Sequence, residues 1–243
     1  MGPAMVKMVP DKTRRFAERP HYAPEDLDRE CERIVSAFLR KKRGAVAFPI
    51  LTEELHVLIE QEDASLDTCV DLSAFGDDVE GVTEFFPDQG PKVSISDKLA
   101  NDARRENRLR TTLAHEFGHV HFHRHLWAEK FLTVRLFDRK SAENKAICKR
   151  DTVLNANQYD WMEWQAGYVS GSVLMPLTHV RQLVSEYCQP LGLHGVVYQG
   201  SQQGLALIAQ VVDRFAVSEE AARIRLLKLN LLAASNTQKS LFS

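Results

Sequence analysis

Regular spacing of apolar residues predicts two helices near the start of the chain. The first runs from Glu25 to about Lys42, after Pro24, and the second covers Thr52–Gln61 with Thr52 as its N-cap. The apolar face of the first helix repeats at i, i+4, i+7 and i+11 and consists of Leu27, Cys31, Ile34 and Phe38. Both segments are therefore expected to cover a hydrophobic core.

The pattern then changes to short runs that are typical of β-strands. We predict strands at Thr68–Leu72, Gly81–Phe86 and Lys92–Ser96, because stretches rich in glycine, aspartate and proline separate them. The exposed edge strand of such a sheet can pair with an extended peptide through main-chain hydrogen bonds. We take Lys92–Ser96 as the candidate edge strand.

Two further helices are predicted in the middle of the chain. The first includes Arg104–Ala114, which contains no proline or glycine, and its buried stripe at i, i+4 and i+8 is Leu109, Leu113 and Phe117. The second begins at Trp161 and ends at or just before Pro176. One face of this second helix carries only small residues, which lets two helix backbones approach closely: Ala166, Gly167, Ser170 and Gly171.

The last predicted helices, at residues 205–215 and 218–230, have a helix–turn–helix pattern in which Ser218 caps the second helix. DNA reading would place the start of that helix in the major groove, where Glu219 and Glu220 would repel phosphate. Residues 203–232 carry four basic and three acidic residues, a net charge of +1. We expect this pair to pack on the rest of the chain, and DNA binding through residues 203–232 is the alternative.

Composition excludes several classes of protein. The 243 residues have a formal charge of −2, which gives no bulk attraction to DNA or to a membrane. No apolar run approaches the ~20 residues that span a bilayer, and the amino terminus lacks the apolar core of a signal peptide. The four cysteines form no Cys-x-x-Cys pair and are expected to be reduced thiols of a cytoplasmic protein: Cys31, Cys69, Cys148 and Cys188.

The strongest chemical motif is His115-Glu-Phe-Gly-His119. Two histidines four residues apart share one face of a helix and can hold one tetrahedral Zn²⁺. Glu116 then lies beside the ion, where it can take a proton from a metal-bound water. The competing interpretation is a pair of helical histidines that only form hydrogen bonds.

A zinc site needs a third protein ligand, and the sequence offers two. His125 follows His119 by six residues, as in metzincin peptidases, but that arrangement needs a chain reversal that Phe122 resists. A straight helix rises ~9 Å over six residues, which also places His125 out of reach. Glu163, on the helix that starts at Trp161, is the other candidate, and spacing alone leaves it undecided between a metal ligand and a solvated carboxylate.

Three motifs together resemble the ImmA/IrrE-type metallopeptidases, which are cytosolic zinc proteases of bacteria and their mobile elements. The motifs are His115-Glu-Phe-Gly-His119, Glu163-x-x-Ala166 and Val173-Leu-Met-Pro176, and the resemblance covers about residues 30 to 230. It implies that His115, His119 and Glu163 bind zinc and that Glu116 is the general base. Gly167 stands where the family has asparagine, and residues 140–159 look like an insertion.

The resemblance also implies a fold and a domain organisation. We expect an α+β, zincin-like metallopeptidase domain at residues 21–198, with a small β-sheet ahead of the His-Glu-x-x-His helix. A mostly helical segment at residues 199–243 is expected to pack on this domain. Residues 1–20, which contain three prolines, are expected to form a disordered leader.

The predicted activity is zinc-dependent endopeptidase cleavage of a cytosolic transcriptional regulator, often a helix–turn–helix repressor in this family. Relief of repression would then switch on a mobile element or a stress response. Tyr168, His123 and His125 are candidate donors to the oxyanion that forms on the substrate. The alternative is that the protein is not an enzyme but a zinc-containing interaction module, which binds a regulator without cutting it.

Overall fold

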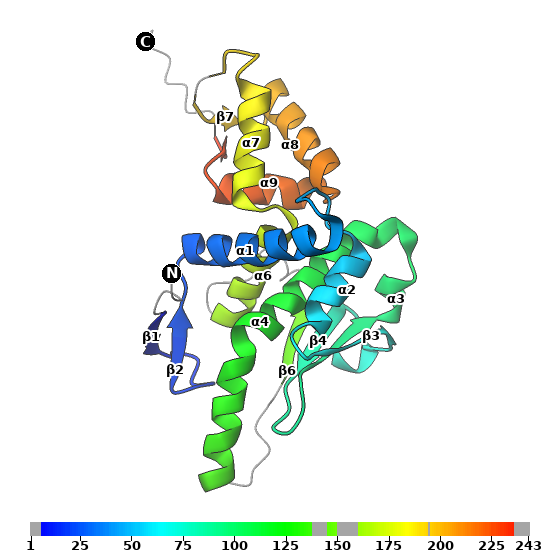
Figure 1. Ribbon diagram of the computed structural model, residues 1–243, viewed down its shortest axis with the longest axis vertical. Coiled ribbons are helices and arrows are strands. Elements are labelled where there is room, and N and C mark those ends of the chain that lie inside the picture. Colours follow the sequence, from blue (N-terminus) through cyan, green and yellow to red (C-terminus); the bar gives the residue numbers. More distant parts are fainter. Residues whose placement is uncertain (1–5, 138–144, 150–159, 194, 236–243) are drawn as a thin grey trace.

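A four-stranded sheet lies next to the helix that carries the two histidines. Its strands are β3 (Ser65–Val70), β4 (Val79–Glu84), β5 (Lys92–Ser96) and β6 (Lys145–Lys149), in the order β3–β5–β4–β6. Strand β5 is parallel to β3 and antiparallel to β4, and β6 is antiparallel to β4. The computed structural model describes residues 6–137, 145–149, 160–193 and 195–235 (Figure 1).

The prediction of three strands is confirmed, although β3 begins three residues and β4 two residues earlier than predicted, but the predicted edge strand was wrong. Strand β5 has a neighbour on both sides, so its main-chain groups are already paired with β3 and β4. The edge next to β4 is taken by β6, which comes from the predicted insertion at residues 140–159. The rest of that insertion, residues 140–144 and 150–159, lies outside the described residues.

The helices agree with the predicted mixed α+β fold. They are α1 (Pro24–Arg43), α2 (Thr52–Glu60), α3 (Asp97–Ala100), α4 (Glu106–Phe137), α6 (Trp161–Leu174), α7 (Leu177–Cys188), α8 (Gln202–Phe215) and α9 (Glu219–Lys228). Short 3₁₀ turns occur at Ser73–Phe75 and Ala103–Arg105, and Val197–Tyr198 (β7) pairs in parallel with Leu232–Ala233 (β8). None of the helices in the described part of the chain combines the length and apolar composition needed to cross a bilayer.

The local signals of the first two helices explain their boundaries. Helix α1 buries the predicted face, with Leu27 and Cys31 fully buried, and ends at Gly44 in the left-handed region (φ 76°). The predicted N-cap of α2 was wrong, because Thr52 is already its first residue and Leu51 is the N-cap. The Glu54 carboxylate accepts the hydrogen bond from the Leu51 N–H (2.8 Å) and so supplies the cap from inside the helix.

The first residues form a β-hairpin, which corrects the expectation of a disordered leader. Strands β1 (Lys7–Pro10) and β2 (Glu18–His21) pair antiparallel. The Asp11 carboxylate, between them, accepts a hydrogen bond from Trp161 Nε1 (3.0 Å), and the Phe16 ring lies edge-on to Trp127 with centroids 5.1 Å apart. These distant contacts order the hairpin, and residues 1–5 lie outside the described part of the chain.

The C-terminal helices gather at one end of the molecule, with the sheet and the far end of α4 at the other (Figure 1). Helix α1 crosses between the two groups, and the predicted cap of α9 is confirmed, since Ser218 Oγ accepts the Ala221 N–H. Arg225 of α9 is buried and donates to Asp28 of α1 (2.6 Å), which fastens α9 to the core. Helix α7 lies with α8 in this group, and the predicted domain boundary at residues 198–199 stays a prediction.

Candidate metal centre

His115 and His119 point the same way from the middle of α4. The helix continues through both residues without a break and runs on to Phe137, so one turn separates the two rings. Their Nε2 atoms lie 3.1 Å apart, and both side chains are fully buried. Two imidazole nitrogens at this separation can both bind one metal ion.

Glu163 completes the cluster from the first turn of α6. Asp160 caps that helix by accepting the Met162 N–H, which fixes the turn that carries Glu163. The Glu163 carboxylate lies 3.1 Å from His115 Nε2 and 3.2 Å from His119 Nε2. Of the three side chains it alone is partly exposed, at 13%.

These three residues fit a zinc ion by both donor type and spacing. Their candidate ligand atoms all lie within 4.8 Å of one another. Atoms bound tetrahedrally to zinc at about 2.0–2.1 Å are separated by roughly 3.4 Å, close to the separations in the cluster. Two imidazoles and one carboxylate leave a fourth position open, which distinguishes catalytic from structural zinc sites.

The two helices approach closely enough for Glu163 to reach the histidines because small residues meet between them. A Cβ atom added at Gly118 of α4 would lie only 3.0 Å from the Cα atom of Ala166 in α6. Of the predicted small-residue face of α6, Ala166 makes this contact, whereas Gly171 faces Arg225 of α9. Gly118 itself was not singled out in the sequence, although a glycine inside a helix signals a packing requirement.

Glu116 lies under strand β4, on the side of α4 that faces the sheet. Its carboxylate accepts a hydrogen bond from Thr83 Oγ1 (2.5 Å), and a Cβ atom at Gly81 would overlap it. Burial raises the pKa of Glu116, although the neighbouring histidines oppose the shift. The second carboxylate oxygen of Glu116 has no hydrogen-bond partner in the described part of the chain. Such a carboxylate can take up a proton at an atom next to the His–His–Glu cluster.

The pKa values of Glu163 and His119 shift in opposite directions because the two side chains attract each other. Burial raises the pKa of Glu163, but His119 and the hydrogen bonds to both histidines outweigh it, so the pKa lies well below its ordinary value. Burial lowers the pKa of His119, but Glu163 more than compensates and the pKa is raised. The anionic carboxylate of Glu163 would stabilise a cation bound among these three side chains.

The other candidate residues lie outside this cluster. His125 is exposed on the continuing helix, as expected from the absence of a chain reversal. His121 contacts Glu62 through Nδ1 (2.7 Å), while His123 is fully buried against His119. The Tyr168 hydroxyl donates to Asp28 (2.8 Å), so this candidate oxyanion donor is already engaged elsewhere.

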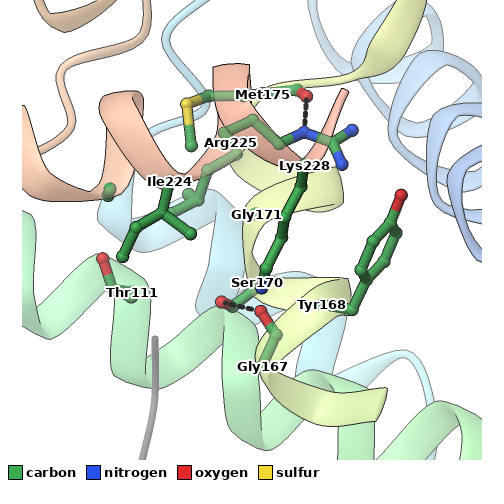
Figure 2. A pocket seen from close by; sticks show the side chains of 11 residues that line it. Thr111, Gly167, Tyr168, Ser170, Gly171, Met175, Ile224, Arg225 and Lys228 are labelled. Atoms are coloured by element: carbon green, nitrogen blue, oxygen red, sulfur yellow. Dashed lines mark hydrogen bonds between the residues drawn. The ribbon is translucent and has the colours of Figure 1, made fainter. Parts of the chain in front are cut away.

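Gly167, which replaces the asparagine of the family pattern, borders a small cavity between α4, α6 and α9 (Figure 2). Arg225 enters the same cavity and donates from Nε to the Met175 carbonyl (3.1 Å). Ser170 donates to the Gly167 carbonyl at 3.0 Å. Within the described residues, the lining of this cavity includes none of the three clustered side chains.

Sequence reasoning did not identify Gly81, Thr83 and Gln165, which contact the candidate site residues or their neighbours. Gly81 and Thr83 reach Glu116 only because β4 packs on α4, a contact between segments more than 30 residues apart. Gln165 follows Glu163 by two residues, and no spacing rule marks it.

Comparison with known proteins identifies a family for this chain. No curated protein matches the sequence. The family model of the IrrE N-terminal-like domain, peptidase M78, matches residues 99–227, which is more than half of the 243 residues. The match includes α4, α6 and all three residues of the cluster. The chain therefore belongs to the peptidase M78 family of IrrE N-terminal-like domains.

Proposed function

We propose that this protein is a zinc-dependent endopeptidase that cleaves a cytosolic transcriptional regulator. The observation that carries the proposal is the convergence of His115, His119 and Glu163, together with Glu116, whose charge interacts with all three. Zinc, when bound, would act as a Lewis acid that polarises a carbonyl group and increases the acidity of water. The family assignment supports a metallopeptidase, and the choice of metal rests on the donor set.

The residues have separate roles in this proposal. His115, His119 and Glu163 would hold the ion, with both histidines fully buried and Glu163 partly exposed. Glu116 accepts a proton from the attacking water and delivers it to the leaving amine. Thr83 holds the Glu116 carboxylate in place for that transfer by donating a hydrogen bond, and the missing side chain of Gly81 leaves room for it.

The proposed substrate is a helix–turn–helix repressor, because the resembling family acts on such proteins. Direct DNA binding by this chain is disfavoured, since Arg225 is buried against Asp28 and Arg223 contacts Glu219. Glu219 and Glu220 begin α9, as expected, and would face phosphate there. A separate protein is therefore the more suitable partner.

The test compares the wild-type protein with the Glu116→Gln variant. Each is loaded with zinc and incubated with an extract of the source cells, and the new protein amino termini are profiled. We expect new termini within a transcriptional regulator only with the wild type, while both proteins contain equal zinc. Identical profiles from the two proteins, at full zinc loading, would contradict the proposed activity.

A module that holds zinc and captures a regulator without cutting it is the second candidate. It is favoured by one observation: the side chains of His115, Glu116 and His119 have no exposed surface, and Glu163 has little. A regulator that co-purifies intact and in a one-to-one ratio with the wild-type protein would support this function. Loss of that intact partner by cleavage would exclude it.

A further inference from the structure

A chain of three hydrogen bonds leads from His119 to the N-terminal hairpin. His119 Nδ1 lies 3.1 Å from His123 Nδ1, and His123 Nε2 lies 2.9 Å from Gln165 Oε1. Gln165 Nε2 in turn lies 3.3 Å from the carbonyl oxygen of Pro20. His119, His123 and Gln165 are all buried, so water does not compete for these bonds.

The direction of every bond follows from the last acceptor. A carbonyl oxygen can only accept, so the NH₂ group of Gln165 faces Pro20 and its oxygen faces His123. That oxygen also can only accept, so His123 carries its proton on Nε2. His123 Nδ1 is then an acceptor, and the proton between the two histidines belongs to His119 Nδ1.

This order leaves the lone pair of His119 on Nε2, the atom that faces His115 and Glu163. A metal ligand needs its lone pair there, and a hydrogen bond at the other ring nitrogen fixes both the tautomer and the ring orientation. His115 lacks such support, because its Nδ1 has no hydrogen-bond partner in the described part of the chain. The two histidines of the motif are thus held by different means.

We propose that His123 and Gln165 are positioning residues that hold His119 in its metal-binding tautomer, with the Pro20 carbonyl as the final acceptor. This inference rests on the proposed metal centre. The proposal also gives a function to the N-terminal hairpin. The Pro20 carbonyl in its strand β2 sets the direction of the hydrogen bonds that lead to His119. The proposal further distinguishes His123 from the exposed His125, two residues further along α4.

Zinc affinity, measured by competition with a chromophoric chelator, tests the role of both residues. His123→Leu and Gln165→Leu should each weaken zinc binding about 10- to 100-fold, the usual effect of removing such support. Because Gln165 acts through His123, the double variant should bind zinc no more weakly than His123→Leu alone. His125→Leu is the matched control and should leave the affinity unchanged. Unchanged affinity in folded His123→Leu, or losses that simply add in the double variant, would overturn the proposal.

The tautomers are measured separately by ¹⁵N NMR of the histidine rings in the metal-free wild-type protein, at a pH high enough to keep both rings neutral. We expect the proton on Nδ1 of His119 and on Nε2 of His123, and a proton on Nε2 of a neutral His119 would overturn the proposal. This measurement does not depend on the folding of any variant. If the wild-type protein bound no zinc, the proposed metal centre would fail, while the NMR result would still decide the direction of the hydrogen bonds.

Discussion

Gly118 of α4 and Ala166 of α6 meet so closely that one added methyl group at residue 118 would lie 3.0 Å from the Ala166 Cα atom. Gly118 directly precedes His119, and Ala166 lies one helical turn after Glu163. The distance between the two backbones therefore sets the distance between the carboxylate and the histidines. Helix packing at this contact therefore sets the geometry of the proposed metal centre.

Gly118→Ala should push the two helices apart. Overpacking lowers the free energy of unfolding by about 1–3 kcal/mol, whereas the higher helix propensity of alanine raises it by about 1 kcal/mol. We therefore expect a modest net loss of stability. Zinc affinity should fall as well, because Glu163 moves away from the histidines. Urea denaturation and chelator competition measure the two effects.

Gly171→Ala, on the same helix as Ala166, is the matched control. Its new Cβ atom would meet only Arg225 Cδ at 3.5 Å, an ordinary contact. We expect stability to rise by about 0.5–1 kcal/mol with zinc affinity unchanged. Equal zinc affinity in the two alanine variants would refute the link between helix spacing and the metal centre.

Gly81→Ala should impair proton transfer without removing the metal. The added methyl group would overlap the Glu116 carboxylate, which must then turn away from its position beside Thr83. General acid–base catalysis contributes about 10²–10⁴-fold to a rate, so we expect a loss of cleavage within that range. Zinc content should remain that of the wild type, and a variant that cleaves normally would show that the position of Glu116 is unimportant.

The ion pair of Arg43 with Glu54 should make stability depend on pH. Burial raises the pKa of Glu54, but hydrogen bonds from Arg43 and the Leu51 N–H outweigh it, and the pKa lies below its ordinary value. The unfolded chain therefore binds a proton more readily, and the stabilisation is present above the ordinary pKa of 4.5 and lost as the pH falls through the folded value. Glu54→Gln should be about 1–3 kcal/mol less stable than the wild type at pH 7. Urea denaturation at pH 7 and pH 3 should show this difference shrinking in acid, and a constant difference would contradict the assignment.

The helices that frame the proposed metal centre could be predicted from the sequence because their signals are local. The apolar stripe that includes Leu113 and Phe117 and the stop at Pro176 mark α4 and α6 without knowledge of the rest of the chain. To predict the site, one must also know that Glu163 lies near the histidines, and this depends on how α4 and α6 pack together. Family resemblance supplied that information, and the small residues of α6 agree with it.

The errors concern contacts between segments far apart in the chain. Strand β6 pairs with β4 from an insertion more than 60 residues later, so no local pattern indicated that β5 would lie inside the sheet. The hairpin at residues 7–21 is ordered by Trp127 and Trp161, more than 100 residues away. The proposed role of His123 likewise depends on Gln165 and Pro20, which only the folded chain brings together.

Zinc content of the purified protein, measured by elemental analysis beside Glu163→Ala and His125→Ala, tests the central claim most directly. We expect about one zinc per chain in the wild type, none or nearly none in Glu163→Ala, and an unchanged amount in His125→Ala. That result would identify Glu163 as the third ligand supplied by α6. Zinc retained in Glu163→Ala and lost in His125→Ala would contradict the proposed site, and so would a wild-type protein that takes up no zinc on reconstitution.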